Sequence, residues 1–90
     1  MFIALPHIAQ SACIDSSQHY EGHPKPHTYV ITVLNRCGET RIVTVKIIDA
    51  VTLEEVKREE FPLADGETRA VIYRFEVEKL LSYAVDHRSE

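Results

Sequence analysis

The alternation of β-branched residues in the middle of the chain constrains its fold more than any other feature. Residues 28–34 and 40–48 are rich in Val, Ile and Thr, as extended strands are. In the first run, Tyr29, Ile31 and Val33 share one face. The opposite face is also largely apolar in both runs, which is typical of central strands covered on both sides. The sequence therefore predicts a sheet built around these two strands.

Two further runs complete a pattern of two successive β-hairpins. Residues 35–39 supply the first turn and Asp65-Gly66 the second. In the third run Val56 and Phe61 have opposite parity, which predicts a bulge or a lightly buried edge strand that ends at Pro62. The four predicted strands are Thr28–Leu34, Thr40–Ile48, Glu54–Phe61 and Glu67–Phe75.

The C-terminal segment fits two patterns. One is an amphipathic helix, because apolar residues recur at i, i+3, i+4 and i+7 at Val77, Leu80, Leu81 and Ala84. The other is a strand, because Leu81, Tyr83 and Val85 alternate. We favour the helix, although no capping residue or glycine marks its start.

The N-terminal quarter lacks any sustained period. Pro24 and Pro26 exclude a helix just before the first strand, because each proline restricts its predecessor to extended geometry. Residues 1–27 are therefore expected to form an extended arm, and residues 28–90 a β-domain. The expected fold class is mainly β: an antiparallel, two-hairpin, sandwich-like single domain with a short C-terminal helix.

Composition narrows the classes of partner. The 90 residues hold ten Lys and Arg against fourteen Asp and Glu, a net charge of −4. No surplus of cations is available to neutralise phosphates, so we expect no nucleic-acid binding. No apolar run is long enough for a membrane span. The apolar patch Phe2–Leu5 lacks a preceding basic residue, so we expect no secretory signal and favour the cytoplasm.

Two cysteines leave the redox state open. In an intracellular protein Cys13 and Cys37 would be free thiols, with Cys37 exposed in a turn. In an oxidising compartment they would pair and close a loop of about 25 residues, which stabilises a fold by roughly 3 kcal/mol.

A histidine-rich stretch is the strongest candidate for metal chemistry. His19, His23 and His27 are each four residues apart, with Cys13 upstream. Imidazoles and a thiolate are good ligands for zinc or copper. The alternative is a polar, flexible arm that happens to be rich in histidine, because Gly22, Pro24 and Pro26 forbid the helix that would bring the three rings together. No serine or cysteine lies in a recognisable nucleophile motif, so we expect no catalytic activity.

The middle of the chain resembles small immunoglobulin-like β-sandwich domains of microbial surface and accessory proteins. The resemblance covers about half of the chain and implies a sandwich architecture with a binding or adhesive role. It lies in an Asn-ended strand, an Asp-ended strand, a Thr-x-Glu turn and a Gly-Glu turn, at residues 29–35, 44–49, 52–56 and 61–68.

We expect a non-catalytic protein-binding or assembly module that acts through an exposed sheet face or strand edge. The motivation is the two-sided apolar character of the central strands in a chain with little left to cover them. A homodimer is the simplest partner arrangement. The alternatives are a small metal-binding protein and a viral or mobile-element regulator that binds a host protein. The expected contact residues are Tyr29, Ile31, Val33, Ile42 and Ile48.

Overall fold

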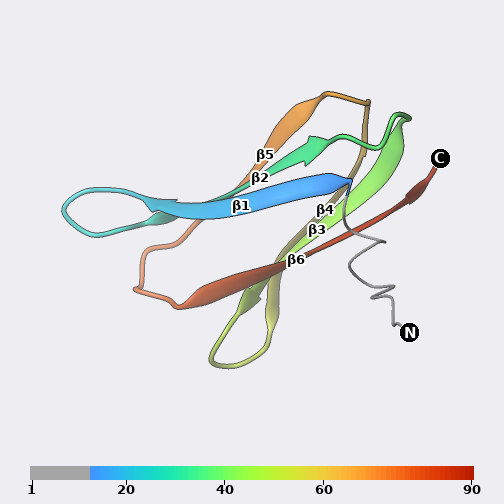
Figure 1. Cartoon of the computed structure of the whole chain (residues 1–90). Coiled ribbons are helices and arrows are strands. Elements are labelled where there is room, and N and C mark those ends of the chain that lie inside the picture. The colour runs from blue at the N-terminus through green and yellow to red at the C-terminus, as the bar shows by residue number, and fades with distance from the viewer. Residues whose placement is uncertain (1–12) are drawn as a thin grey trace, which may run out of the picture.

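The computed structural model describes residues 13–90, which form six antiparallel strands (Figure 1). Within these residues there is no helix, and hence none of the length and hydrophobicity that a bilayer-spanning helix needs. The strands are β1 (Ile14–Glu21), β2 (Thr28–Asn35), β3 (Arg41–Asp49), β4 (Glu55–Leu63), β5 (Thr68–Arg74) and β6 (Leu81–Ser89).

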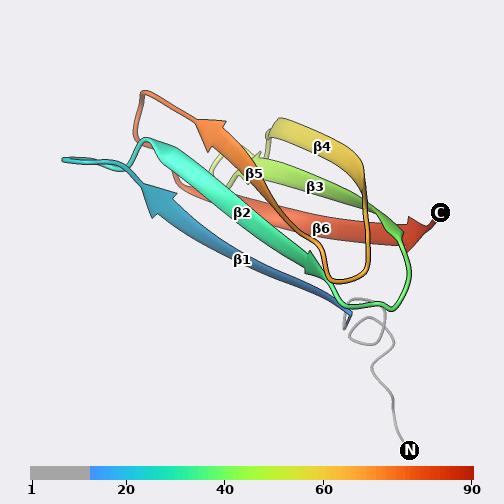
Figure 2. The same ribbon diagram turned by 90° about the horizontal axis from the view of Figure 1, so that it is seen from above.

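The strands form two three-stranded sheets that lie face to face (Figure 2). One sheet has the order β1-β2-β5 and the other the order β4-β3-β6. The prediction of a mainly antiparallel β fold is therefore confirmed. β2 and β3 are the central strands of the two sheets, as their apolar character indicated.

The inner faces of β2 and β3 form the centre of the core, and residues of the other strands complete it. Alternate residues of each strand point into the sandwich, and a sheet packed on one face buries every second side chain. The six inward-pointing side chains of these two strands are fully buried: Tyr29, Ile31, Val33, Val43, Val45 and Ile47.

The pairing of the strands differs from the two predicted hairpins. β2 does not turn back onto β3, and β4 does not turn back onto β5, because in each case the chain crosses to the other sheet. The hairpins are β1–β2 and β3–β4 instead. The predicted arm thus supplies a strand, β1, while residues 1–12 lie outside the described residues.

The opposite parity of Val56 and Phe61 predicted either a bulge or an edge strand, and β4 has both features. It is an edge strand, and its register against β3 shifts between Ile47 and Ile48, which skips one residue of β4. This bulge lets both Val56 and Phe61 pack against the core. Pro62 does not end the strand, since an edge strand tolerates the missing N–H.

The predicted C-terminal helix is wrong, because residues 81–89 form strand β6 along the free edge of β3. Leu81 is buried there, and Tyr83 and Val85 pack partly against the core. The segment follows its strand pattern rather than its helix pattern. As a strand it hydrogen-bonds the backbone N–H and C=O groups along the edge of β3 that β4 leaves unpaired.

A buried asparagine organises the crossing from β2 to β3. Asn35 is fully buried, and its side-chain amide donates to the carbonyls of Glu39 and Leu63, at 2.9 and 2.7 Å. Its Oδ1 accepts the backbone N–H of Cys37 at 2.7 Å. Cys37 is disulfide-bonded to Cys13, which ties the start of β1 to this crossing.

The buried and exposed isoleucines of the first sheet provide a matched test of the core. We expect Ile31→Ala to lower the free energy of unfolding by about 3 kcal/mol, because it leaves a cavity between the sheets. Ile72→Ala, on the outer face of β5 and 45% exposed, should cost less than about 1 kcal/mol. Equilibrium urea unfolding of both variants measures the difference. Equal losses would contradict the assignment of the core.

Candidate binding surface at one end of the sandwich

Three loops lie toward one end of the sandwich, two on the left and one at the bottom of Figure 1. They join β1 to β2, β3 to β4 and β5 to β6, and comprise residues 22–27, 50–54 and 75–80. We call this end the loop end. The disulfide and the C-terminus of β6 lie at the opposite end.

The exposed apolar side chains are concentrated at the loop end. Within residues 13–90, six large apolar side chains are exposed. Four of them lie in these loops, Tyr20 lies near the end of β1 beside the β5–β6 loop, and Ile72 lies on the outer face of β5. Clustering of this kind, unlike single exposed apolar residues, marks an interaction surface. The other five, which we call the apolar cluster, are Tyr20, Val51, Leu53, Val77 and Leu80.

Asp49 fixes the conformation of the β3–β4 loop. Its Oδ1 accepts the backbone N–H groups of Val51 and Thr52, at 2.9 and 3.1 Å, and its backbone carbonyl accepts the N–H of Leu53 at 2.8 Å. Leu53 is held with φ at +66°, which a bulky residue rarely adopts. An apolar side chain held 78% exposed on a strained backbone is a feature found at binding sites.

The β3–β4 and β5–β6 loops are joined to each other. The N–H of Ala50 donates to the carbonyl of Leu80 at 2.9 Å, and Lys79 Nζ lies 3.4 Å from Asp49 Oδ2. The two loops that carry four of the five cluster residues therefore form one connected surface.

Tyr20 connects the β1 side to the same surface. Its hydroxyl accepts the N–H of Leu81 at 3.1 Å, and its ring lies 4.8 Å from that of Tyr29 and 6.3 Å from that of Phe75, measured between centroids. Burial raises the pKa of Tyr29 to about 12, so its hydroxyl stays protonated and donates to Gln18. A groove of about 190 Å³ beside Tyr20 is lined by Pro26, Phe75, Glu78, Lys79 and Leu80.

The structure does not bring the predicted metal ligands together. The sulfur of Cys13 is committed to the disulfide at the far end of β1, and His19 lies six residues along that strand, about 20 Å away. His19 contacts Glu21 at 2.8 Å, and His27 pairs with the hydroxyl of Thr28 at 3.0 Å. Within the described residues, the group of histidine, cysteine and acidic side chains close enough for a shared ion is Cys13, Cys37 and His87.

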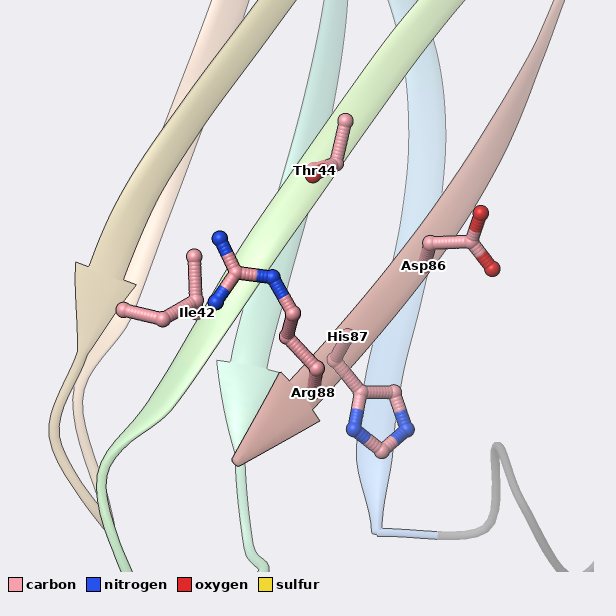
Figure 3. Close-up of a pocket in the computed structure, with 5 residues that line it drawn as sticks. All are labelled: Ile42, Thr44, Asp86, His87 and Arg88. Atoms are coloured by element: carbon pink, nitrogen blue, oxygen red, sulfur yellow. The ribbon is translucent and has the colours of Figure 1, made fainter. Parts of the chain in front are cut away.

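The predicted protein contacts divide between core and surface. Tyr29, Ile31 and Val33 are fully buried because the second sheet covers them, so no partner can reach them in the folded chain. Ile42 and Ile48 are half-buried on the outer face of β3. Ile42 lines a hollow with Thr44, Asp86, His87 and Arg88 (Figure 3).

That hollow carries charged groups beside its apolar ones. Arg88 reaches across the sheet to Glu60, with Nη2 2.9 Å from Oε2, so its charge is already paired. Asp86 adds a carboxylate in the β6 wall of the hollow. The apolar cluster at the loop end is therefore the stronger candidate for a binding surface.

Sequence reasoning missed the apolar cluster, although a signal was present. Val51 and Leu53 are apolar residues inside a turn, and turns are usually polar. Val77 and Leu80 were explained by the stripe of a helix that the structure does not contain.

Comparison of the chain with protein-family models, with curated proteins and with solved structures finds no match.

The turn at Asp49 predicts a specific dependence of stability on pH. Hydrogen bonds from Thr52 and Val51, and then Lys79, hold the pKa of Asp49 below its ordinary value. A lowered folded-state pKa stabilises the fold fully above the unfolded pKa of about 4, and this contribution is lost as the pH falls below it. We expect Asp49→Asn, whose amide oxygen can still accept both N–H bonds, to lose less stability between pH 4 and pH 2 than the wild type. Urea unfolding across this range measures it, and identical pH profiles would contradict the role of the charge.

Proposed function

We propose that this chain is a non-catalytic binding module that docks an apolar protein surface against its loop end. The observation that carries the proposal is the concentration of exposed large apolar side chains at that end, where four of the six lie in the loops and Tyr20 lies beside them. Loops on a rigid β-scaffold are a common place for binding residues, because the scaffold holds them while their sequence varies.

The hydrogen bonds within and between the loops favour the view that the exposed apolar side chains bind a partner and are not exposed by chance. The turn at Asp49 and the bond from Ala50 to Leu80 hold the cluster residues before any partner arrives. A surface ordered in advance loses less conformational entropy on association. The proposal thus replaces the sheet face and strand edge expected from sequence with a loop surface.

The charges around the cluster define the chemistry of the partner. The three loops carry Glu54, Glu76 and Glu78 against Lys25 and Lys79. This acidic balance disfavours an anionic lipid surface, which attracts basic segments. It complements a protein partner with an apolar centre and basic groups around it.

We also propose that the sandwich is immunoglobulin-like. The support is the resemblance of residues 29–35, 44–49, 52–56 and 61–68, together with two antiparallel sheets in which β2 and β5, and β3 and β6, pair across long connections. In that architecture the loops cluster at the two ends of the sandwich and serve recognition. This is an analogy of architecture and not of activity.

Photo-crosslinking from the loop end tests the proposed function. A photoreactive amino acid is placed at position 51 or 77, and at position 72 as a control that is equally apolar and also exposed. Each chain is irradiated alone at high concentration and in an extract of the cells that make it. We expect adducts from positions 51 and 77 and none from position 72, because only the loop end docks a partner.

The mass of the adduct identifies the partner. Twice the chain mass would support a homodimer, and a different mass would support another protein, such as the host target of a regulator. Adding Leu53→Ser to the chain labelled at position 77 should reduce the yield several-fold. No adduct, or equal adducts from position 72, would reject the proposal.

A further inference from the structure

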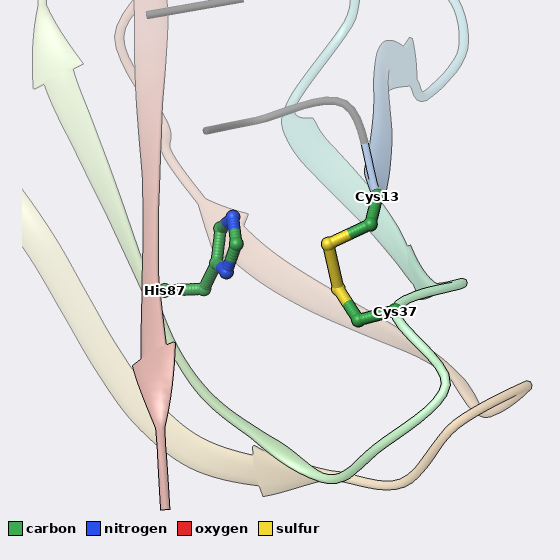
Figure 4. A group of neighbouring side chains, drawn as sticks. All are labelled: Cys13, Cys37 and His87. Carbon is green, nitrogen blue, oxygen red and sulfur yellow. A yellow bond between two sulfur atoms is a disulfide. The ribbon is translucent and has the colours of Figure 1, made fainter. Parts of the chain in front are cut away.

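The most concentrated set of potential metal ligands lies at the end of the sandwich opposite the loop end. Cys13, Cys37 and His87 come from three different parts of the chain, and Figure 4 shows the His87 ring facing the disulfide. Their ligand atoms all lie within 4.8 Å of one another. Each of the three residues is half-buried, so the group is shielded yet reachable from solvent.

We propose that reduction of the Cys13–Cys37 disulfide converts this group into a zinc site with two thiolate ligands and one imidazole ligand. Zinc takes Cys sulfur at about 2.3 Å and His nitrogen at about 2.0–2.1 Å in tetrahedral geometry. Those bond lengths place neighbouring ligand atoms about 3.3–3.8 Å apart. The ligand atoms lie within 4.8 Å of one another, and the two sulfurs can separate to the required spacing once the bond between them is broken. A water molecule completes the four ligands.

The positions of the two cysteines do not depend on the disulfide alone. The N–H of Arg36 donates to the carbonyl of Cys13 at 2.7 Å, and the side chain of Asn35 accepts the N–H of Cys37 at 2.7 Å. Arg36 also forms an ion pair with Asp15 at 2.8 Å. These contacts hold both residues in place after the sulfur–sulfur bond is broken.

His87 is held independently, in the other sheet. It lies opposite Val43 in the register of β3 and β6, with its side chain on the inner side of the sheet. A metal at this group would link the β4-β3-β6 sheet to the β1-β2-β5 sheet, as the disulfide does not. The site therefore keeps the link between Cys13 and Cys37 through the metal and adds a link to the second sheet.

The chemistry balances with a dithiol as the reductant. The dithiol gives two electrons and two protons, the Cys13–Cys37 bond breaks to two thiols, and the dithiol becomes a disulfide. Zinc then displaces the two thiol protons to solvent and binds both sulfurs and His87. A small-molecule disulfide reverses the sequence: it takes two electrons from the thiolates and two protons from solvent and becomes a dithiol, while the Cys13–Cys37 bond re-forms and the metal is released.

Metal titration of oxidised and reduced full-length chain tests the proposal. The chain is reduced with a phosphine, which takes an oxygen atom from water and leaves its two protons on the thiols, and is then desalted under nitrogen. Cobalt(II) is added as a spectroscopic substitute for zinc, and zinc affinity is measured by competition with a chromophoric chelator. We expect one cobalt per reduced chain with thiolate charge-transfer absorption, and none per oxidised chain.

Two histidine variants locate the site. His87→Gln should weaken zinc binding by more than about 100-fold, since the loss of even an outer-shell partner costs about 10–100-fold. His19→Gln, the same change on exposed β1, should leave the affinity unchanged. Melting of the oxidised variants confirms that both fold. The Cys13→Ser, Cys37→Ser double variant should bind no zinc, and its circular dichroism reports whether the fold survives without the disulfide.

The results of these experiments decide between the proposed zinc site and its alternatives. A reduced chain that takes up no cobalt would exclude it, as would an unchanged affinity in His87→Gln. Zinc bound by the oxidised chain and lost in His19→Gln would assign the metal to the histidine stretch His19, His23 and His27. A reduced chain that loses its structure and regains it with zinc would support the site, because binding and folding are then coupled.

Discussion

The packing of β2 against β3 is the contact on which the rest of the structure depends. Both strands place three fully buried side chains between the sheets, so each must be the centre of its own sheet. That requirement forces the chain to cross from one sheet to the other between them. Asn35 makes the crossing specific, because its side chain binds the carbonyl of Leu63 at the far end of the second sheet's edge strand. The buried side chain of Asn35 is satisfied in this way by protein groups rather than by water.

Local patterns in the sequence were enough to place four of the six strands but not to pair them. The β-branched alternation of residues 28–48 and the conflicting parity of Val56 and Phe61 both correspond to observed features. The pairing could not be read in the same way, because a turn with Asn35 and Gly38 suits a hairpin and a crossing equally. The deciding contact is from Asn35 to Leu63, which lies 28 positions away. Strand β6 was misjudged for a related reason, since its role depends on the free edge of β3.

The site residues were less accessible to sequence reasoning than the fold. The capping roles of Asp49 and Thr52 follow from local chemistry, but their effect, a rigid loop with Leu53 held outward, needs the three-dimensional turn. The spacing of His19, His23 and His27 suggested that Cys13 would join them in one site. Cys13 lies instead at the opposite end of β1, next to Cys37 and His87. His87 carries no local signal at all, because only the pairing of β6 with β3 brings it to the disulfide.

The crossings between sheets also set the order in which the fold can assemble. The hairpins β1–β2 and β3–β4 join neighbours in sequence, whereas β3 pairs with β6 at Arg41 and Ser89, 48 positions apart. Contacts of such long range are typical of β-proteins that fold in milliseconds to seconds. During synthesis, β2 and β3 emerge with one edge open until β5 and β6 follow. A nascent chain therefore leaves one edge of each of its two most apolar strands unpaired for that interval, and unpaired edges favour pairing with other chains.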